Sequence, residues 1–210
     1  MGLYGRFILP KLVNLACRTS PVTRQRRKVI PKATGTVLEL GFGSGLNIPF
    51  YDASQVRQVL ALEPSKEMWS LAEESVRSAQ FEVEHLEASA EEVPLADGSA
   101  DTVVATYTLC TIPDLAVALR EIRRVLKPGG ALVFCEHGAA PDEDVRRWQN
   151  RLNPIWTRIA GGCNLNRPIP PLLEEGGFRI QEMDTMYLPG WRPANFNYWG
   201  TAVAVQGGTR

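Results

Sequence analysis

Short apolar runs alternate with segments of helical periodicity along most of the chain. Leu115, Leu119, Ile122 and Leu126, for example, recur at helical spacing and predict an amphipathic helix over residues 114–126. The predicted parallel strands are, in chain order, residues 36–40, 56–62, 81–86, 102–108 and 131–135. Because strands and helices alternate, the pattern predicts an α/β domain with a mostly parallel sheet.

Capping residues and prolines place the ends of the helices. Ser65 is a good N-cap for a helix to about residue 79, and Asp114 caps the amphipathic helix. The sequence K-P-G-G at 127–130 predicts a turn that ends that helix. A helix over 142–160 is expected to be interrupted at Pro154, which lacks a backbone N–H. Short helices are also predicted after Gly45 and over 168–176.

The two ends of the chain differ from this alternating pattern. The last two predicted strands, 178–188 and 198–205, have no long helix between them, which indicates an antiparallel hairpin. Residues 1–34 precede the first strand and are interpreted as a helical arm or lid, with 35–210 as a single domain. One face of the arm would carry Phe7, Ile8, Leu12 and Leu15. Such a face suits docking on the core, a lid over the site, or an interfacial anchor.

Charge is balanced over the 210 residues, and the net charge of zero excludes a global basic field for nucleic acid. Before Glu39, however, every charged residue is basic. These residues are Arg6, Lys11, Arg18, Arg24, Arg26, Arg27, Lys28 and Lys32. Two interpretations stay open: a solvated face, or contact with an anionic membrane surface or substrate. No apolar run reaches the roughly 18 residues of a membrane span, and no signal peptide is evident. A cytoplasmic protein is therefore expected, either free or in peripheral contact with a membrane surface.

Cysteine and histidine are few and widely spaced. The cysteines are Cys17, Cys110, Cys135 and Cys163, and the histidines are His85 and His137. There is no C-x-x-C pair and no metal-like spacing, so reduced thiols and no metal site are expected. Cys110 is interpreted as a small buried apolar residue rather than a nucleophile.

A glycine-rich turn follows the first predicted strand. Residues 37–45 read V-L-E-L-G-F-G-S-G, with Gly41, Gly43 and Gly45 at alternate positions. Glycine permits positive φ and lets a ligand approach the backbone. Glu39 places a carboxylate at the mouth of this turn, which suits a cationic ligand better than a phosphate. The pattern therefore favours S-adenosylmethionine over a nucleotide, with Asn47 just beyond the turn.

A second carboxylate ends the second predicted strand in L-A-L-E-P-S. Glu63 lies about 20 residues after the glycine turn, where an acidic residue accepts hydrogen bonds from ribose hydroxyls. It also precedes a helix N-terminus, where a carboxylate is favourable in any case. Pro64, Ser65 and Met68 follow in the same segment and are predicted to line the site.

Two more loops are expected at the same edge of the sheet. Ser89, Ala90 and Glu91 follow the third strand and are candidates for contact with adenine. Tyr107 and Thr108 end the fourth strand, and their backbone carbonyls are candidates for holding the methionyl ammonium beside the transferred methyl. Tyr107 is also a candidate catalytic residue.

Five motifs, in this order, resemble the class I S-adenosylmethionine-dependent methyltransferases of the methyltransferase domain 11 type. They are E-L-G-F-G-S-G, A-L-E-P-S, A-E-E-V-P-L, Y-T-L-C and R-R-V-L-K-P-G-G, and they span about residues 35–138. The segments F-C-E-H-G-A-A-P, G-G-C-N-L-N-R and W-R-P-A-N-F-N-Y-W-G-T-A-V-A are similar to the alkyl-thiol methyltransferase-like branch. The resemblance implies a Rossmann-like fold, with a mostly parallel seven-stranded sheet, a C-terminal antiparallel hairpin and helices on both faces. Many relatives have Asp where this chain has Ser89 and Glu63.

The resemblance also implies a function, S-methylation of a small apolar thiol. Quinone C-methylation and phospholipid N-methylation are the alternative reactions. Two other classes of protein also stay open: an oxidoreductase that binds a nicotinamide cofactor, and a module that binds the cofactor without catalysis. His137 follows the fifth strand and is either a general base or a hydrogen-bond partner of a loop, with Glu136 a weaker base candidate. The residues expected on the acceptor side are Trp156, Asn164, Arg167, Trp191, Asn195 and Trp199.

Overall fold

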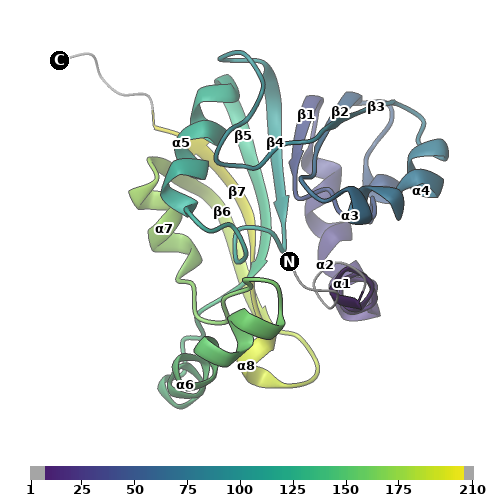
Figure 1. Ribbon diagram of the computed structural model, residues 1–210. Coiled ribbons are helices and arrows are strands. Elements are labelled where there is room, and N and C mark those ends of the chain that lie inside the picture. The colour runs from purple at the N-terminus through teal and green to yellow at the C-terminus, as the bar shows by residue number, and fades with distance from the viewer. Residues whose placement is uncertain (1–7, 206–210) are drawn as a thin grey trace.

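The computed structural model describes residues 8–205, which form a seven-stranded sheet in the order β3-β2-β1-β4-β5-β7-β6 (Figure 1). The strands are β1 Gly35–Leu40, β2 Val56–Leu62, β3 Glu82–Leu86, β4 Ala100–Thr106, β5 Leu126–His137, β6 Phe178–Tyr187 and β7 Phe196–Ala204. The first five are parallel to one another, whereas β7 runs antiparallel to both β5 and β6. The predicted mostly parallel sheet with a terminal antiparallel hairpin is confirmed.

Helices cover both faces of this sheet, as predicted. They are α1 Leu9–Cys17, α2 Ser20–Val29, α3 Lys66–Ser70, α4 Glu73–Arg77, α5 Leu115–Val125, α6 Glu143–Ile159, α7 Ile169–Glu175 and α8 Arg192–Asn195, with 3-10 turns η2 Ile30–Lys32 and η3 Ile48–Phe50. The core between the sheet and α5 and α7 contains Leu38 and Leu40 of β1. The core under α2 and α4 contains Val37. Successive residues of β1 therefore point to opposite faces, each covered by its own helices.

Two predictions about helix ends and turns need correction. The helix after Ser65 is divided into α3 and α4, because Leu71 and Ala72 donate to carbonyls three residues back, Met68 and Trp69, instead of four. Ser65 is nevertheless the N-cap, with its Oγ accepting from the backbone N–H of Met68 at 3.1 Å. The predicted turn at 127–130 lies within the bounds of β5, as an irregularity where the register with β4 shifts.

Pro154 does not interrupt its helix, since α6 continues through it. A proline removes the hydrogen bond to the carbonyl four residues earlier, here that of Asn150. Both Pro154 and Asn150 are exposed, so water can satisfy that carbonyl and the break expected from the sequence does not occur. Among residues 8–205, no helix is both long and apolar enough to cross a membrane.

Candidate functional site

The loops predicted to bind ligand lie at one edge of the sheet. The glycine turn follows β1, Glu63 follows β2, Tyr107 follows β4, and His137 ends β5, all strands that run in the same direction. Figure 1 shows α1, α6 and α8 gathered at the end to which the arrows of β4 and β5 point. In open parallel sheets, ligands bind beyond the carboxyl ends of the strands. The topology therefore makes this edge the candidate site.

The glycine turn adopts a backbone that other residues rarely take. Gly41, Gly43 and Gly45 have φ values of +59°, +59° and +72°. A Cβ on Gly41 would stand 2.6 Å from Thr108 Oγ1, which itself donates to the Leu40 carbonyl at 3.1 Å. The absence of side chains thus allows the turn after β1 to pack directly on the loop after β4.

Glu63 connects the glycine turn to the end of β2. Its Oε2 accepts from the Gly43 N–H at 2.8 Å, and its Oε1 accepts from the Ser65 N–H at 2.9 Å. Burial raises the pKa of this carboxyl, against the lowering effect of those two N–H donors. The predicted contact with a helix N-terminus is therefore present. A carboxylate retains further lone pairs, so a ribose contact stays a prediction. Pro64 follows Glu63 directly in the chain, and Met68 Cε lies 3.2 Å from where a Cβ of Gly43 would be.

Glu39 does not stand open at the mouth of the turn, because only 2% of it is exposed. Its carboxylate accepts from Tyr51 Oη at 2.6 Å and from Asn47 Nδ2 at 2.9 Å. Asn47 Nδ2 also donates to Thr106 Oγ1 at 3.0 Å, and its Oδ1 accepts from Arg26 Nη1 at 2.7 Å. Burial raises the pKa of Glu39 to about 7, although the Tyr51 hydrogen bond and the Arg26 charge oppose this rise.

Arg26 is the residue of this network that the sequence did not reveal. Only 5% of it is exposed, and its Nη1 donates to Thr106 Oγ1 at 2.7 Å as well as to Asn47. Its Nε is buried and has no hydrogen-bond partner among the described residues. The interpretation of the basic arm as one solvated face is thus wrong for Arg26. The other described cations of the arm are exposed; they are Lys11, Arg18, Arg24, Arg27, Lys28 and Lys32.

A helical pattern could have identified Arg26 as buried. In α2 the buried residues are Gln25, Arg26 and Val29, so Arg26 lies one turn before an apolar position. The arm also reaches the glycine turn through α1, where Asn14 Oδ1 accepts from Ser44 Oγ at 2.7 Å. Both helices of the arm therefore contact the candidate site.

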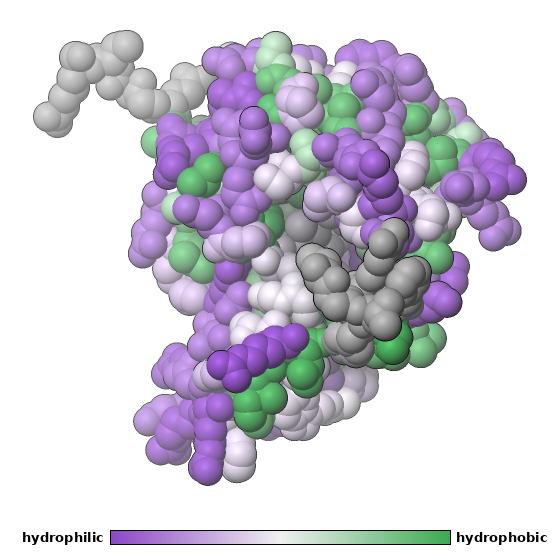
Figure 2. Space-filling model, viewed as in Figure 1, coloured by the Kyte–Doolittle hydropathy of each residue, from purple (hydrophilic) through white to green (hydrophobic). Residues whose placement is uncertain are grey.

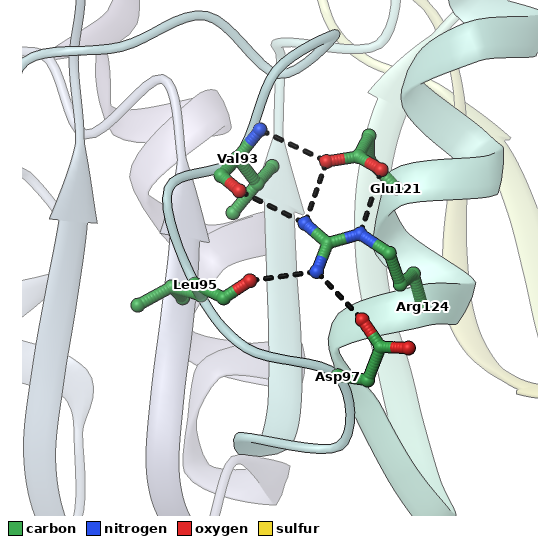
Figure 3. A network of polar contacts seen from close by, with 5 residues as sticks. All are labelled: Val93, Leu95, Asp97, Glu121 and Arg124. Carbon is green, nitrogen blue, oxygen red and sulfur yellow. Dashed lines mark hydrogen bonds and ion pairs between the residues drawn. The ribbon is translucent and has the colours of Figure 1, made fainter.

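The loop after β3, which holds the predicted adenine contacts, is fixed by an ion-pair network with α5 (Figure 3). Arg124 donates to the carbonyls of Val93 at 2.9 Å and Leu95 at 2.6 Å, and to Asp97 Oδ1 at 2.9 Å. Glu121 accepts from both Arg124 and the Val93 N–H. The fixed segment immediately follows Ser89, Ala90 and Glu91.

Within this loop, the three predicted residues differ in exposure. Ala90 is buried, and Ser89 and Glu91 are half-buried. Glu91 Oε1 accepts from the Asp114 N–H at 3.3 Å, at the start of α5. Glu91 therefore lies at the N-terminal end of α5, and the contact of all three residues with adenine stays a prediction.

The loop after β4 is held by the buried carboxylate of Glu136. This carboxylate is 0% exposed and accepts from the N–H groups of Thr108 at 2.7 Å, Leu109 at 2.9 Å and Cys110 at 3.4 Å. Burial raises its pKa, and the N–H donors oppose that rise. Because three backbone donors occupy it, Glu136 positions this loop, a role that the sequence did not indicate.

Tyr107 precedes that loop and carries the one positive φ, 56°, of a non-glycine residue among those described. Its Oη donates to Asn197 Oδ1 at 2.6 Å on β7, and burial raises its pKa well above the usual value. A left-handed tyrosine is costly, so the surrounding hydrogen bonds must over-determine it. The phenol therefore contacts β7, and a catalytic role for it stays a prediction.

His137 and two cysteines lie together at the ends of β4 and β5. His137 Nε2 is 3.0 Å from Cys163 Sγ, and the ligand atoms of Cys110, His137 and Cys163 all lie within 4.8 Å of one another. Cys110 is buried, as predicted. Their spacing in the sequence did not reveal this cluster, because the residues belong to three separate segments that only the fold brings together, and the expectation of no metal site stays a prediction.

The residues expected on the acceptor side do not all lie together. Asn164 Nδ2 donates to the Cys110 carbonyl at 3.0 Å, and Arg167 donates to the Ile112 carbonyl at 2.7 Å. The rings of Trp156 and Trp191 stand 5.9 Å apart. The remaining two lie elsewhere: Asn195 donates to the Pro189 carbonyl, and Trp199 lies under the Lys28 ammonium.

Comparisons with known proteins agree with this arrangement. A family model described as a methyltransferase domain matches residues 38–134. Thiol S-methyltransferase TMT1A of Homo sapiens is 34% identical, covering 82% of this chain and 72% of the relative. Thiol S-methyltransferase TMT1B of Homo sapiens is 36% identical, covering 84% and 74%. A solved S-adenosylmethionine-dependent methyltransferase from Aquifex aeolicus has a TM-score of 0.65 at 18% identity, over 93% of this chain and 98% of that one, a likeness of fold.

Proposed function

This chain belongs to the family of class I S-adenosylmethionine-dependent methyltransferases that includes the two human thiol S-methyltransferases, and we propose that it methylates the sulfur of a small apolar thiol. The similarity to those two relatives over most of the chain carries this proposal. The earlier alternative of an oxidoreductase that binds a nicotinamide cofactor is set aside, because the family is one of methyltransferases. Quinones and phospholipids remain as alternative acceptors for experiment.

The residues at the sheet edge fit the methyl donor. When bound, S-adenosylmethionine supplies an electrophilic methyl group on a sulfonium. Gly41 and Gly43 have no side chains and take positive φ, so the backbone of this turn is open where the donor would pass. Glu63 retains lone pairs for the ribose hydroxyls, and the loop of Ser89 to Glu91 is available to adenine. Glu39 does not face the donor directly, and its part is to hold Asn47 by accepting a hydrogen bond from Asn47 Nδ2.

Arg26 is proposed to pair with the carboxylate of the donor. Its guanidinium is buried against Asn47 and Thr106, and its Nε has no partner among the described residues. Leaving a buried charged donor unsatisfied costs free energy, which an anionic ligand group would recover. A carboxylate held there would also orient the methionyl part of the donor towards Tyr107 and Thr108.

The reaction itself is an in-line displacement. The acceptor thiol loses its proton, its sulfur forms a bond to the methyl carbon, and the bond from that carbon to the sulfonium breaks. The protein contributes alignment of the two sulfurs. Since a free thiol with a pKa near 8.5 is a few per cent ionised at neutral pH, a dedicated base is not essential. His137 stays a candidate base, with its Nε2 already beside Cys163.

The N-terminal arm is proposed to act as a lid with an exposed outer face. Asn14 contacts the glycine turn at Ser44, whereas Leu12 and Leu15 are 49% and 68% exposed. Figure 2 shows hydrophobic surface at the end of the molecule where α6 lies, and Ile155 of α6 is 62% exposed. Together with the exposed cations of the arm, these residues support peripheral contact with an anionic membrane surface. The division into an arm of 1–34 and a domain of 35–210 stays a prediction.

Calorimetric titration with S-adenosylmethionine, S-adenosylhomocysteine and NAD tests the donor. We expect the first two to bind and NAD not to bind. Uptake of labelled methyl by a panel of apolar thiols, quinones and phosphatidylethanolamine vesicles then tests the acceptor. Methylation of thiols alone is the expected result, and methylation of only a quinone or a lipid would refute the thiol assignment.

A further inference from the structure

Three soft ligand atoms converge at the acceptor side of the site. Cys110 comes from the loop after β4, His137 from the end of β5, and Cys163 from the segment after α6. Their ligand atoms all lie within 4.8 Å of one another. The proposed methyl transfer does not use the thiols of Cys110 and Cys163, so it does not explain why these two thiols and the imidazole lie together.

The backbone around the cluster is fixed before any ligand binds. Asn164, next to Cys163, donates to the Cys110 carbonyl through both its backbone N–H at 2.9 Å and its Nδ2 at 3.0 Å. Glu136, next to His137, accepts from the Cys110 N–H. The backbone of Cys110 is thus tied to the residue next to Cys163 and to the residue next to His137. A pre-organised set of ligands binds a metal ion without the cost of ordering loops.

The side chains have unused capacity for a ligand. His137 Nε2 faces Cys163 Sγ at 3.0 Å and can bind a cation through its lone pair when the neutral ring carries its proton on Nδ1, which is buried and has no hydrogen-bond partner among residues 8–205. Trp156 Nε1 donates to Cys163 Sγ at 3.4 Å, and a donor of this kind stabilises a thiolate more than a thiol. The cluster therefore contains groups that a cation would engage.

The composition of the cluster fits zinc. Two thiolates and one imidazole, with a fourth position open, are a known ligand set of catalytic Zn²⁺ sites. With Zn–S near 2.3 Å and Zn–N near 2.0–2.1 Å, tetrahedral ligand atoms stand about 3.5–3.8 Å apart. Atoms already within 4.8 Å of one another need only small side-chain movements to reach that geometry.

We propose that Cys110, His137 and Cys163 bind a Zn²⁺ ion whose open fourth position takes the sulfur of the acceptor. The ion site stands on the cluster alone, and only its role towards the acceptor rests on the proposed thiol methylation. Binding releases one proton from each cysteine thiol, and the acceptor thiol releases one more when its sulfur binds. The acceptor sulfur then forms the new bond to the methyl carbon as the bond to the sulfonium breaks, with no change of oxidation state.

The location of the cluster agrees with this role. Cys110 follows Tyr107 and Thr108, the residues predicted to lie beside the transferred methyl, by only two to three positions. Trp156 contacts Cys163, and its ring lies 5.9 Å from that of Trp191, which provides aromatic surface for an apolar thiol next to the ion. In this arrangement His137 is a ligand and no longer a base.

Metal binding is tested on the full chain, after removal of metal by chelator under reducing conditions. Titration with Co²⁺ should produce the intense near-ultraviolet thiolate band and the visible bands of a tetrahedral site, saturating at one ion per chain, and Zn²⁺ should displace it. Cys110→Ser, Cys163→Ser and His137→Ala should each weaken Co²⁺ binding at least tenfold. Cys135→Ala is the matched control, because Cys135 is buried in β5 outside the cluster, and it should bind like wild type.

A second measurement needs no variant and so does not depend on folding of the substituted chains. Alkylation of wild type with iodoacetamide, followed by peptide mapping, should label Cys163, the half-buried thiol of the cluster, in the metal-free protein and show it protected when Zn²⁺ is present. Failure of wild type to bind Co²⁺ or Zn²⁺, or equal binding by the cluster variants, would refute the metal site.

Addition of benzyl mercaptan tests the fourth position. The visible spectrum of the Co²⁺ protein should change on saturation with this thiol, and chelator should slow its methylation, with recovery on return of Zn²⁺. Methylation that proceeds unchanged in chelator, with normal binding of S-adenosylmethionine, would refute the zinc inference and leave the proposed function standing. Loss of S-adenosylmethionine binding or of all thiol methylation in the metal-loaded enzyme would instead refute the proposed function.

Discussion

Arg26 Nη1 donates a hydrogen bond to Asn47 Oδ1 at 2.7 Å, which joins a buried cation of the N-terminal arm to the segment that follows the glycine turn. The two residues stand 21 positions apart in the sequence. Through Asn47 the contact continues to the buried carboxylate of Glu39. The arm therefore completes the electrostatic environment at the carboxyl end of β1.

Replacement of Arg26 should weaken binding of the methyl donor. We expect Arg26→Lys to reduce the affinity for S-adenosylmethionine about tenfold or more, because a lysine cannot reproduce the directed guanidinium hydrogen bonds. Calorimetric titration measures this change, with the unfolding temperature recorded in parallel. Arg24→Ala, which removes an exposed cation of the same helix, is the control and should bind like wild type. Unchanged affinity in Arg26→Lys would exclude the proposed carboxylate contact.

Glu63 should contribute to binding of the donor ribose. Glu63→Ala is expected to weaken binding of S-adenosylhomocysteine by about 1.5–3 kcal/mol, the scale of a hydrogen bond to a charged group. Part of the loss will reflect the freed N–H groups of Gly43 and Ser65. Titration with adenine, which has no ribose, separates the two effects, since a loss confined to ligands with ribose indicates direct contact. Glu74→Ala, on the exposed surface of α4, is the control.

The buried carboxyl of Glu39 should make stability depend on pH. Its pKa is raised from 4.5 to about 7 in the folded protein, so the folded state binds this proton more tightly than the unfolded state. The free energy of unfolding should therefore fall as pH rises from about 4.5 to 7, by at most about 3 kcal/mol from this group. Glu39→Gln should lose that component, which urea unfolding at pH 5 and pH 8 measures. Identical pH dependence in wild type and variant would contradict the raised pKa.

A side chain at Gly41 should be costly for two separate reasons. Gly41→Ala places a Cβ at 2.6 Å from Thr108 Oγ1 and imposes φ of +59° on alanine. Gly129→Ala imposes a similar positive φ of +81° with no atom within 4 Å of the new Cβ, so it measures the backbone strain alone, about 1–2 kcal/mol. We expect Gly41→Ala to lower the free energy of unfolding more than Gly129→Ala does. Equal losses would show that the loop after β4 moves aside freely.

The sequence by itself determined those features that local patterns encode. The strands, the N-caps at Ser65 and Asp114, and the left-handed glycines of the turn after β1 were all predictable, because periodicity, capping and φ preferences act over a few residues. The interruption at Pro154 was predicted wrongly, since exposure to water, a property of the folded surface, decides whether a helix tolerates proline.

Only the tertiary structure decided which side chains share the site. Arg26 meets Thr106 across 80 positions, Glu136 meets the loop after β4 across 26 to 28 positions, and Cys163 meets His137 across 26. Such contacts follow from the order of strands in the sheet and from the helix that covers each face, both of which are set by packing of the whole chain. Burial then shifts the pKa values of the ionisable residues in these contacts. Removal from water raises the free energy of an unpaired charge, so each hydrogen-bond partner has a larger effect on the protonation state.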